Sequence, residues 1–393
     1  MTLVPHDVDT LGRWLAEHTE ELIAFRRHLH AHPEVSWQEH ATTEAVVQRL
    51  GAAGLGARGL ATGTGAVCDL GGHDGPVIAL RADLDALAMA DEKDVPYRSR
   101  VPGVAHACGH DVHTTIVLGA GLYLAHHLGE DDRRVRLIFQ PAEEQVPGGA
   151  VTAIEDGVLD DVSAVYGLHC DPKLATGHIG LRPGPLTSAA DMLSIRLSGP
   201  GGHTARPDET VDLVPIAGAV AVRLRDEITS RIGDPGDVRV AFGAIRAGDA
   251  PNVIPTAAEL RASVRTPSIE VWDQLPEVAE AAVAAIVDDT GAGWTIDHTR
   301  GVPPVVNDPM TTALVDETAR RWIGPDAVTE AVQSWGGDDF AWYLREVPGT
   351  YIRLGTRNPA WTDPPLDLHV GRFDADEGAI GVGIRLLVGL AFG

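Results

Sequence analysis

Apolar residues near the start of the chain recur at the spacing of a helix. This spacing predicts a helix at residues 9–25 and a second one at 41–50. Short continuous apolar runs follow and predict buried strands, at residues 66–70, 77–81, 135–139 and 164–168. A further helix is expected at 114–128. Alternating strands and helices are typical of an α/β sheet that helices cover on both faces.

The pattern changes near residue 183, because residues 192–197 alternate between apolar and polar as a half-buried strand does. The elements predicted after this strand are a helix, two strands, a helix and a strand, at residues 212–230, 238–245, 258–264, 271–289 and 294–296. This order is that of a ferredoxin-like α+β domain. We therefore expect such a domain to be inserted at residues 184–298. Residues 1–183 and 299–393 would then form one α/β domain with a mixed central sheet flanked by helices.

Composition argues against several classes of function. The net charge of −25 opposes binding to nucleic acid and to anionic membranes. The chain has no run of about 18 apolar residues, so no membrane span is expected. Three cysteines do not make a disulfide framework, and the first nine residues lack the basic and apolar regions of a signal peptide. Both features predict a cytoplasmic protein.

Metal-binding groups are concentrated in His-Ala-Cys-Gly-His-Asp-Val-His, at residues 106–113. Further candidates are Glu143 and Glu144, His169 and His369. Thiolate, imidazole and carboxylate are the usual ligands of zinc and related ions. Several of these residues follow predicted strands, and ligand sites in open α/β sheets gather at the carboxyl ends of strands. A metal site built from distant segments is therefore expected.

The adjacent Glu143 and Glu144 are predicted to have different roles. One carboxylate could bind metal while the other accepts a proton from a metal-activated water, as metal-assisted hydrolysis requires. A solvated acidic pair is the alternative, since the chain holds 56 acidic residues.

The chain resembles the dinuclear metallopeptidases that include aminoacylase, glutamate carboxypeptidase and succinyl-diaminopimelate desuccinylase. Within them it is most similar to the amidohydrolase branch of hippurate hydrolase, indoleacetyl-amino-acid hydrolases and N-acetyl-diaminopimelate deacetylase. The motifs that carry the resemblance run along nearly the whole chain, at residues 26–34, 80–87, 106–111, 139–144, 199–203, 252–255 and 336–340.

The resemblance implies a site for two divalent metal ions. Its ligands would be Cys108, His110, Glu144, His169 and His369, with Cys108 standing where the wider family has a bridging aspartate. Glu143 would be the general base that activates the water. Zinc or manganese is the expected metal, and the donors also suit cobalt or nickel.

The resemblance also implies that the inserted domain covers the site and joins two subunits into a homodimer. His203 would then reach the neighbouring subunit's site and polarise the scissile carbonyl. Asn252 and Arg265 would hold the substrate's carboxylate or carbonyl, and Gly355 would offer its backbone amide.

Three positions depart from the family pattern. The wider family's His-x-Asp motif reads Asp83-Leu84-Asp85 here, a change that the branch shares. Asp338 replaces a glutamate, and Gly371 replaces the proline that usually follows the last histidine ligand. In the segment 106–113, His106, Asp111 and His113 are expected to support the ligands or to begin the helix, with Asp111 as the N-cap before Thr114.

These observations predict a metal-dependent amidohydrolase that cleaves an N-acyl or N-aroyl amino acid. Two alternatives stay open. One is a dipeptidase or aminopeptidase acting on small peptides, and the other is a binding protein that keeps the metal without catalysis.

Overall fold

The computed structural model describes residues 7–72, 75–129, 133–233 and 238–393. The prediction that a signal peptide is absent rests on the first nine residues, and most of these lie outside the described ranges. The chain forms two compact units. The first comprises Met1–Leu186, Val306–Val332 and Asp339–Gly393, and the second comprises Thr187–Val305 and Gln333–Asp338.

An eight-stranded mixed sheet forms the centre of the first unit, in the order β1-β2-β4-β3-β5-β16-β6-β15. Its strands are β1 Arg58–Gly59, β2 Ala66–Leu70, β3 Val77–Asp83, β4 Arg134–Gln140, β5 Val162–Ala175, β6 Ile179–Leu181, β15 Val328–Glu330 and β16 Gly349–Arg357. The central strands β4, β3, β5 and β16 pair in parallel. Their carboxyl ends therefore meet at one edge of the sheet.

Helices enclose this sheet, and every residue of β3 is buried, as expected for a strand covered on both faces. The helices are α1 Val8–Ala31, α2 His40–Ala52, α3 His110–His127, α4 Gly149–Glu155, α7 Pro309–Trp322, α8 Phe340–Glu346 and α9 Gly378–Ala391. Helix α3 packs against β3, α1 and α9, while α4 and α8 contact each other. A short ribbon pairs β7 Gly184–Pro185 with β14 Val306–Asn307.

The predicted α/β architecture is confirmed, but the start of one helix is wrong. Helix α3 begins at His110 rather than at Thr114, and its N-cap is Gly109 in the left-handed conformation. Asp111 is therefore inside the first turn. Its side chain is fully buried against Arg26 and His30 instead of capping the helix. The earlier start matters because it places the candidate ligand His110 on the helix.

The second unit has the predicted ferredoxin-like order. Its elements are β8 Ala190–Ser198, α5 Leu213–Ile232, β10 Arg239–Ala247, β12 Ala257–Arg265, α6 Ile269–Val287 and β13 Gly293–Val302. The antiparallel sheet runs β10-β12-β8-β13, and α5 and α6 share an apolar core with it. A small ribbon of β9 Gly202–His203 and β11 Val253–Ile254 extends from this sheet. Two 3-10 turns, Pro207–Glu209 and Asp288–Thr290, complete the unit.

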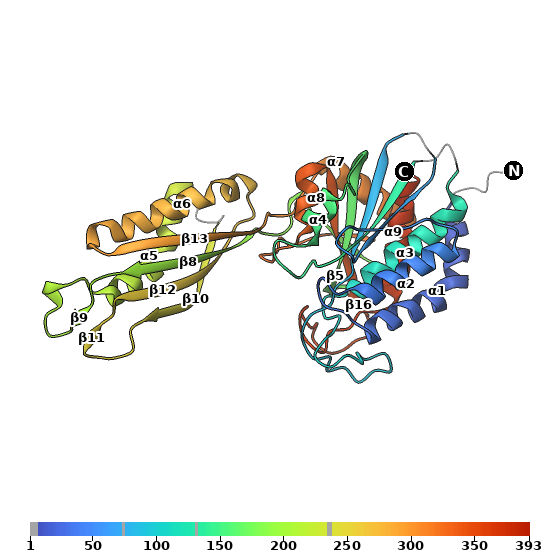
Figure 1. Ribbon diagram of the computed structural model, residues 1–393. Helices are drawn as coiled ribbons and strands as arrows, with labels where there is room; N and C mark the ends of the chain where they lie inside the picture. The colour runs from blue at the N-terminus through green and yellow to red at the C-terminus, as the bar shows by residue number, and fades with distance from the viewer. Residues whose placement is uncertain (1–6, 73–74, 130–132, 234–237) are drawn as a thin grey trace. The chain divides into compact units, whose positions relative to one another are not determined.

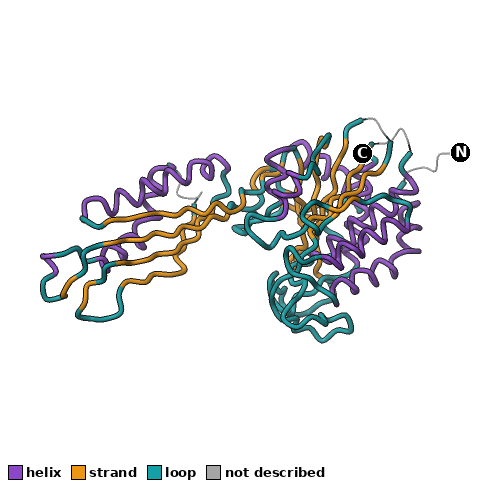
Figure 2. The backbone as a smooth tube through the Cα atoms, in the orientation of Figure 1, coloured by secondary structure: helices purple, strands orange, loops and turns teal. Residues whose placement is uncertain are grey.

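Two long loop segments lie side by side in the first unit, at residues 84–109 and 358–377 (Figure 2). The Glu92 N–H donates to the Gly371 carbonyl over 2.7 Å, and the His369 N–H donates to the Ala107 carbonyl over 2.9 Å. These bonds bring His369 close to Cys108 across about 260 residues of sequence. Among the described helices, none is long and apolar enough to cross a membrane.

Candidate metal centre

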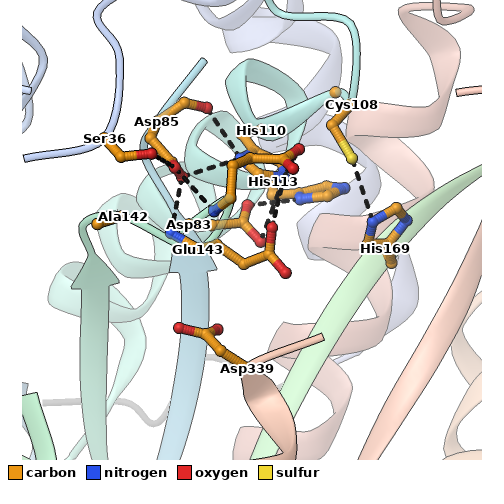
Figure 3. A network of polar contacts seen from close by, with 12 residues as sticks. Ser36, Asp83, Asp85, Cys108, His110, His113, Ala142, Glu143, His169 and Asp339 are labelled. Carbon is orange, nitrogen blue, oxygen red and sulfur yellow. Dashed lines mark hydrogen bonds and ion pairs between the residues drawn. The ribbon is translucent and has the colours of Figure 1, made fainter. Parts of the chain in front are cut away.

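The expected ligands converge at the carboxyl edge of the central strands. Three groups of donor atoms each lie within 4.8 Å of one another: Cys108, His110 and His169; Cys108, Glu144 and His369; and His110, Glu143 and Glu144. Figure 3 shows most of these side chains pointing toward a common space. The fold therefore brings together all five expected ligands and the expected base.

Two histidines are held so that the same ring nitrogen is available to a metal. His110 donates from Nδ1 to the Asp85 carbonyl over 2.9 Å, and His169 donates from Nδ1 to the Cys170 carbonyl over 2.8 Å. A neutral imidazole whose Nδ1 carries the proton keeps a lone pair on Nε2. His110 Nε2 is fully buried and has no hydrogen-bond partner among the described residues. A buried imidazole nitrogen without another partner is the arrangement expected of a metal ligand.

The field around His110 is strongly negative. Burial alone would lower its pKa, but Asp83, Asp85 and Glu144 outweigh that effect and raise the pKa of His110 to about 10. The same carboxylates that favour a proton also favour a divalent cation in its place. Their attraction is strong because the site is poorly screened by water.

Cys108 requires such a cation to act as a ligand. Its side chain is buried, and Sγ lies 3.4 Å from His169 Nε2. Burial and the charges of Glu144 and Glu143 raise the pKa of the Cys108 thiol well above its usual range. A metal ion would supply the positive charge that deprotonates a thiol in these surroundings.

His369 completes the set from the loop 358–377. Its Nε2 lies 3.2 Å from Glu144 Oε1, and its backbone has a positive φ of 59°. The neighbouring Gly371 is explained by packing, since a Cβ there would lie 2.6 Å from the Ala90 carbonyl oxygen. The absence of the usual proline at this position thus has a steric reason.

Asp83 and His113 are hydrogen-bonded to each other next to the candidate ligands, a pairing that the sequence did not predict. The Cys170 N–H donates to His113 Nε2 over 2.9 Å, so the His113 proton lies on Nδ1 and is donated to Asp83 over 2.7 Å. Burial opposes the charge of Asp83, but His110, His113 and Arg81 hold the pKa of this carboxyl well below its usual range. Asp83 is thus an anion beside the donor atoms, in the place of the wider family's histidine.

The four expected substrate-binding residues lie on both units. His203 and Asn252 are exposed on the β9–β11 side of the second unit, where His203 pairs with Val253. Arg265, also in the second unit, donates to the Trp335 carbonyl over 2.8 Å. In the first unit the Gly355 N–H donates to the His178 carbonyl over 2.9 Å. This amide therefore has an intramolecular hydrogen-bond partner, and its role toward substrate stays a prediction.

The donor set fits divalent metal. Thiol, imidazole and carboxylate donors come together from buried, half-buried and exposed residues, His110 Nε2 has no hydrogen-bond partner in the described part of the chain, and the surrounding charge is negative. The Asp85 carbonyl accepts from His110 and the Asp83 carboxylate accepts from His113, and hydrogen bonds of this kind normally orient metal ligands and their neighbours. Asp338, one of the departures from the family pattern, is buried and lies in the short 333–338 segment of the second unit.

Comparisons with known proteins show the family to which the chain belongs. The model of peptidase family M20/M25/M40 matches residues 79–392. N-acetyl-L-cysteine deacetylase of Bacillus subtilis is 37% identical over 92% of this chain and 85% of its own length. The solved structure of a dinuclear metal-binding M20 peptidase from Bacillus subtilis has a TM-score of 0.84 at 33% identity, covering 96% of this chain and 98% of that one.

A Rhodococcus jostii protein with the provisional name glutamate–cysteine ligase 2-3 is 43% identical over 97% of this chain. This chain spans 48% of that protein's length. The family match covers most of the chain, and the chain therefore belongs to peptidase family M20/M25/M40. Within this family it is a metal-dependent amidohydrolase.

Proposed function

We propose that this amidohydrolase cleaves the amide bond of N-acyl or N-aroyl amino acids. The observation that carries the proposal is the convergence of Glu143 and Glu144, whose carboxylate oxygens both lie 3.9 Å from His110 Nε2. The deacetylase name of one relative supports an N-acyl amino acid as the substrate.

In this proposal Cys108, His110, Glu144, His169 and His369 hold two divalent ions, with zinc or manganese as the first choice and cobalt or nickel as alternatives. When bound, the ions supply positive charge that lowers the pKa of a nearby water and stabilises charge on the carbonyl oxygen. Glu143 accepts the proton of the attacking water and returns it to the amine as the amine leaves. The poorly solvated site strengthens each of these interactions.

The test is a panel of N-acetyl, N-benzoyl and unblocked dipeptide substrates, assayed with wild type and Glu143→Gln. Wild type should hydrolyse the N-blocked substrates, and the variant should lose about 10²- to 10⁴-fold in kcat because a general base contributes that much. Metal content should not change. Glu330→Gln, on the exposed edge strand β15, serves as the control. Equal rates for wild type and Glu143→Gln would refute the assigned base, and activity on dipeptides alone would favour a peptidase.

We further propose that residues 184–298 act as a lid and as the dimerisation domain, so that His203 completes the neighbouring subunit's site. Three observations support it. β10 is an edge strand, and Val222 on α5 is 77% exposed. The Ala205 N–H donates to His203 Nδ1 over 3.0 Å, which leaves the ring proton on Nε2 for donation to a carbonyl.

Mixing two inactive variants tests this shared site. His203→Ala and Glu143→Gln homodimers should both be impaired, while the mixed dimer should regain activity in the site that has both groups. A monomer by light scattering, or no recovery on mixing, would contradict the proposal.

A further inference from the structure

Hydrogen bonds from its backbone N–H groups hold the loop that carries Glu143 and Glu144 in place. It follows β4, and Ala142 has a positive φ of 55° although it is not glycine. Three consecutive N–H groups then donate to carboxylates. Ala142 donates to Glu39 Oε1 over 2.8 Å, and Glu143 and Glu144 donate to the two oxygens of Asp85 over 3.1 and 3.0 Å. Figure 3 shows the Asp85 part of this arrangement, with the Ser36 hydroxyl beside it donating to Asp85.

Glu39 is placed at a helix start but does not cap the helix. It is the N-cap residue of α2, yet its side chain makes no capping bond. Glu34 caps this helix instead, because it accepts from the Ala41 and Thr42 N–H groups and from the Thr42 hydroxyl. The Glu39 carboxylate turns away from its own helix and accepts from the Trp37 and Ala142 N–H groups. The Glu39 side chain is therefore oriented toward the loop after β4 and bonds to it rather than to its own helix.

The burial of Glu39 indicates that this orientation is specific. The residue is 0% exposed, and desolvation of a carboxylate is unfavourable unless hydrogen bonds offset it. Left-handed backbone at a non-glycine residue persists only where the surroundings fix it, and such strain gathers at functional sites. Ala142 is bonded on both sides, since its carbonyl also accepts from the Gly149 N–H over 2.9 Å.

We propose that Glu39 is a positioning residue for catalysis, which holds Ala142 in its left-handed conformation and thereby directs the Glu143 and Glu144 side chains into the metal centre. Asp85, which follows β3, accepts hydrogen bonds from the next two N–H groups, those of Glu143 and Glu144. This proposal rests on the proposed function for its kinetic consequence, but its structural part concerns the loop alone.

The test compares Glu39→Ala, Glu39→Gln and Glu34→Ala. Glu39→Ala should lower kcat by about 10- to 100-fold, as loss of a supporting hydrogen bond at a metal site does, with KM changed by no more than about threefold. Glu39→Gln keeps an oxygen that can accept from Ala142 and should recover most of kcat. Glu34→Ala removes a carboxylate from the same loop without touching residues 142–144. It should lower the melting temperature while leaving kcat near wild type.

Hydrogen exchange of the metal-free proteins provides a readout that does not depend on activity. The peptide containing residues 141–145 should exchange faster in Glu39→Ala than in wild type or Glu34→Ala. This measurement separates the two proposals, because it decides the role of Glu39 even if wild type fails to hydrolyse N-acyl amino acids. If Glu39→Ala does not fold, Glu39→Asp, whose shorter side chain retracts the carboxylate, should show the same faster exchange.

Unchanged exchange at residues 141–145 in the folded Glu39 variants would overturn the proposal. It would equally be overturned if Glu34→Ala lowered kcat as much as Glu39→Ala, since the loss would then reflect general loop stability.

Discussion

At the scale of single residues, the ring orientation of two imidazole donors is fixed by a hydrogen bond from the other ring nitrogen. His110 and His169 both donate from Nδ1 to a backbone carbonyl, which leaves Nε2 for the metal. The sequence identified both histidines as candidates because of their neighbours in the chain. It did not identify Glu39 or the bond between Asp83 and His113, because those contacts join segments far apart in sequence and exist only once distances are known.

Cys108→Ser is predicted to lower the metal content per chain before it affects the fold. A hydroxyl is a poorer ligand for zinc-like ions than a thiolate, and its similar size leaves the packing nearly intact. Metal analysis after gel filtration, together with thermal unfolding of the metal-free protein, measures both effects. Cys170→Ser is the matched control, since Cys170 is equally buried but bonds to the Gly109 carbonyl. Full metal occupancy in Cys108→Ser would contradict the prediction.

At the scale of elements, the join between the loop 84–109 and helix α3 determines where two ligands lie. Gly109 is the N-cap of α3 with φ of 89°, and Cys108 and His110 stand on either side of it. Periodicity placed the helix correctly but began it at residue 114. The first turn contains His110, Asp111 and His113, all buried polar residues, and an apolar pattern gives no signal for such a turn.

Gly109→Ala should destabilise the metal-free protein by about 2–5 kcal/mol, combining left-handed strain with overpacking. The added Cβ would lie 2.7 Å from Cys170 Sγ. Gly103→Ala is the control, because Gly103 also has a positive φ (74°) but has no atom within 4 Å of the added Cβ. The free energy of unfolding of Gly103→Ala should fall only by the cost of the left-handed strain, about 1–2 kcal/mol. Chemical denaturation measures both, and equal losses would show that the contact with Cys170 is unimportant.

A buried carboxylate stabilises the second unit in a pH-dependent way. Burial disfavours the charge of Asp191, but hydrogen bonds from His298, the Gly301 N–H and Trp272 outweigh it and lower the pKa of this carboxyl. Its contribution is therefore complete above the unfolded value of about 3.9 and is lost as the pH falls through the lower folded pKa. Asp191→Asn should cost about 1–3 kcal/mol near pH 6. Melting curves from pH 3 to 6 should show this difference shrinking below about pH 4, and a constant difference would argue against ionisation as the cause.

At the scale of the whole molecule, the described residues form two separate apolar cores, one for each unit. The candidate metal ligands all lie in the first unit. The segment Gln333–Asp338 belongs to the second unit although it lies far beyond β13 in sequence. Element order alone gives no signal for that return of the chain, because the segment contains no periodic helix or strand pattern.

Thermal unfolding should therefore occur in two transitions, of which metal raises only one. Metal at about 100 times its Kd should raise the transition of the first unit by roughly 5–10 °C for each ion bound, because each ion adds about 2.7 kcal/mol to its stability. A chelator should reverse this shift. Calorimetry with and without metal is the measurement, and Asp191→Asn identifies the transition of the second unit. A single transition that moves as a whole would contradict independent unfolding.

The sequence by itself determined the two-domain α/β and ferredoxin-like architecture and the chemical types of the candidate ligands, because both follow from local periodicity and from residue types. The tertiary structure decided which nitrogen each histidine presents, that Asp111 is buried beside Arg26 rather than capping α3, and that the Gly355 amide is already bonded. It also decided that Glu39 accepts from the Ala142 N–H at the start of the loop of Glu143 and Glu144. Those outcomes depend on distances between segments that only the folded chain brings together.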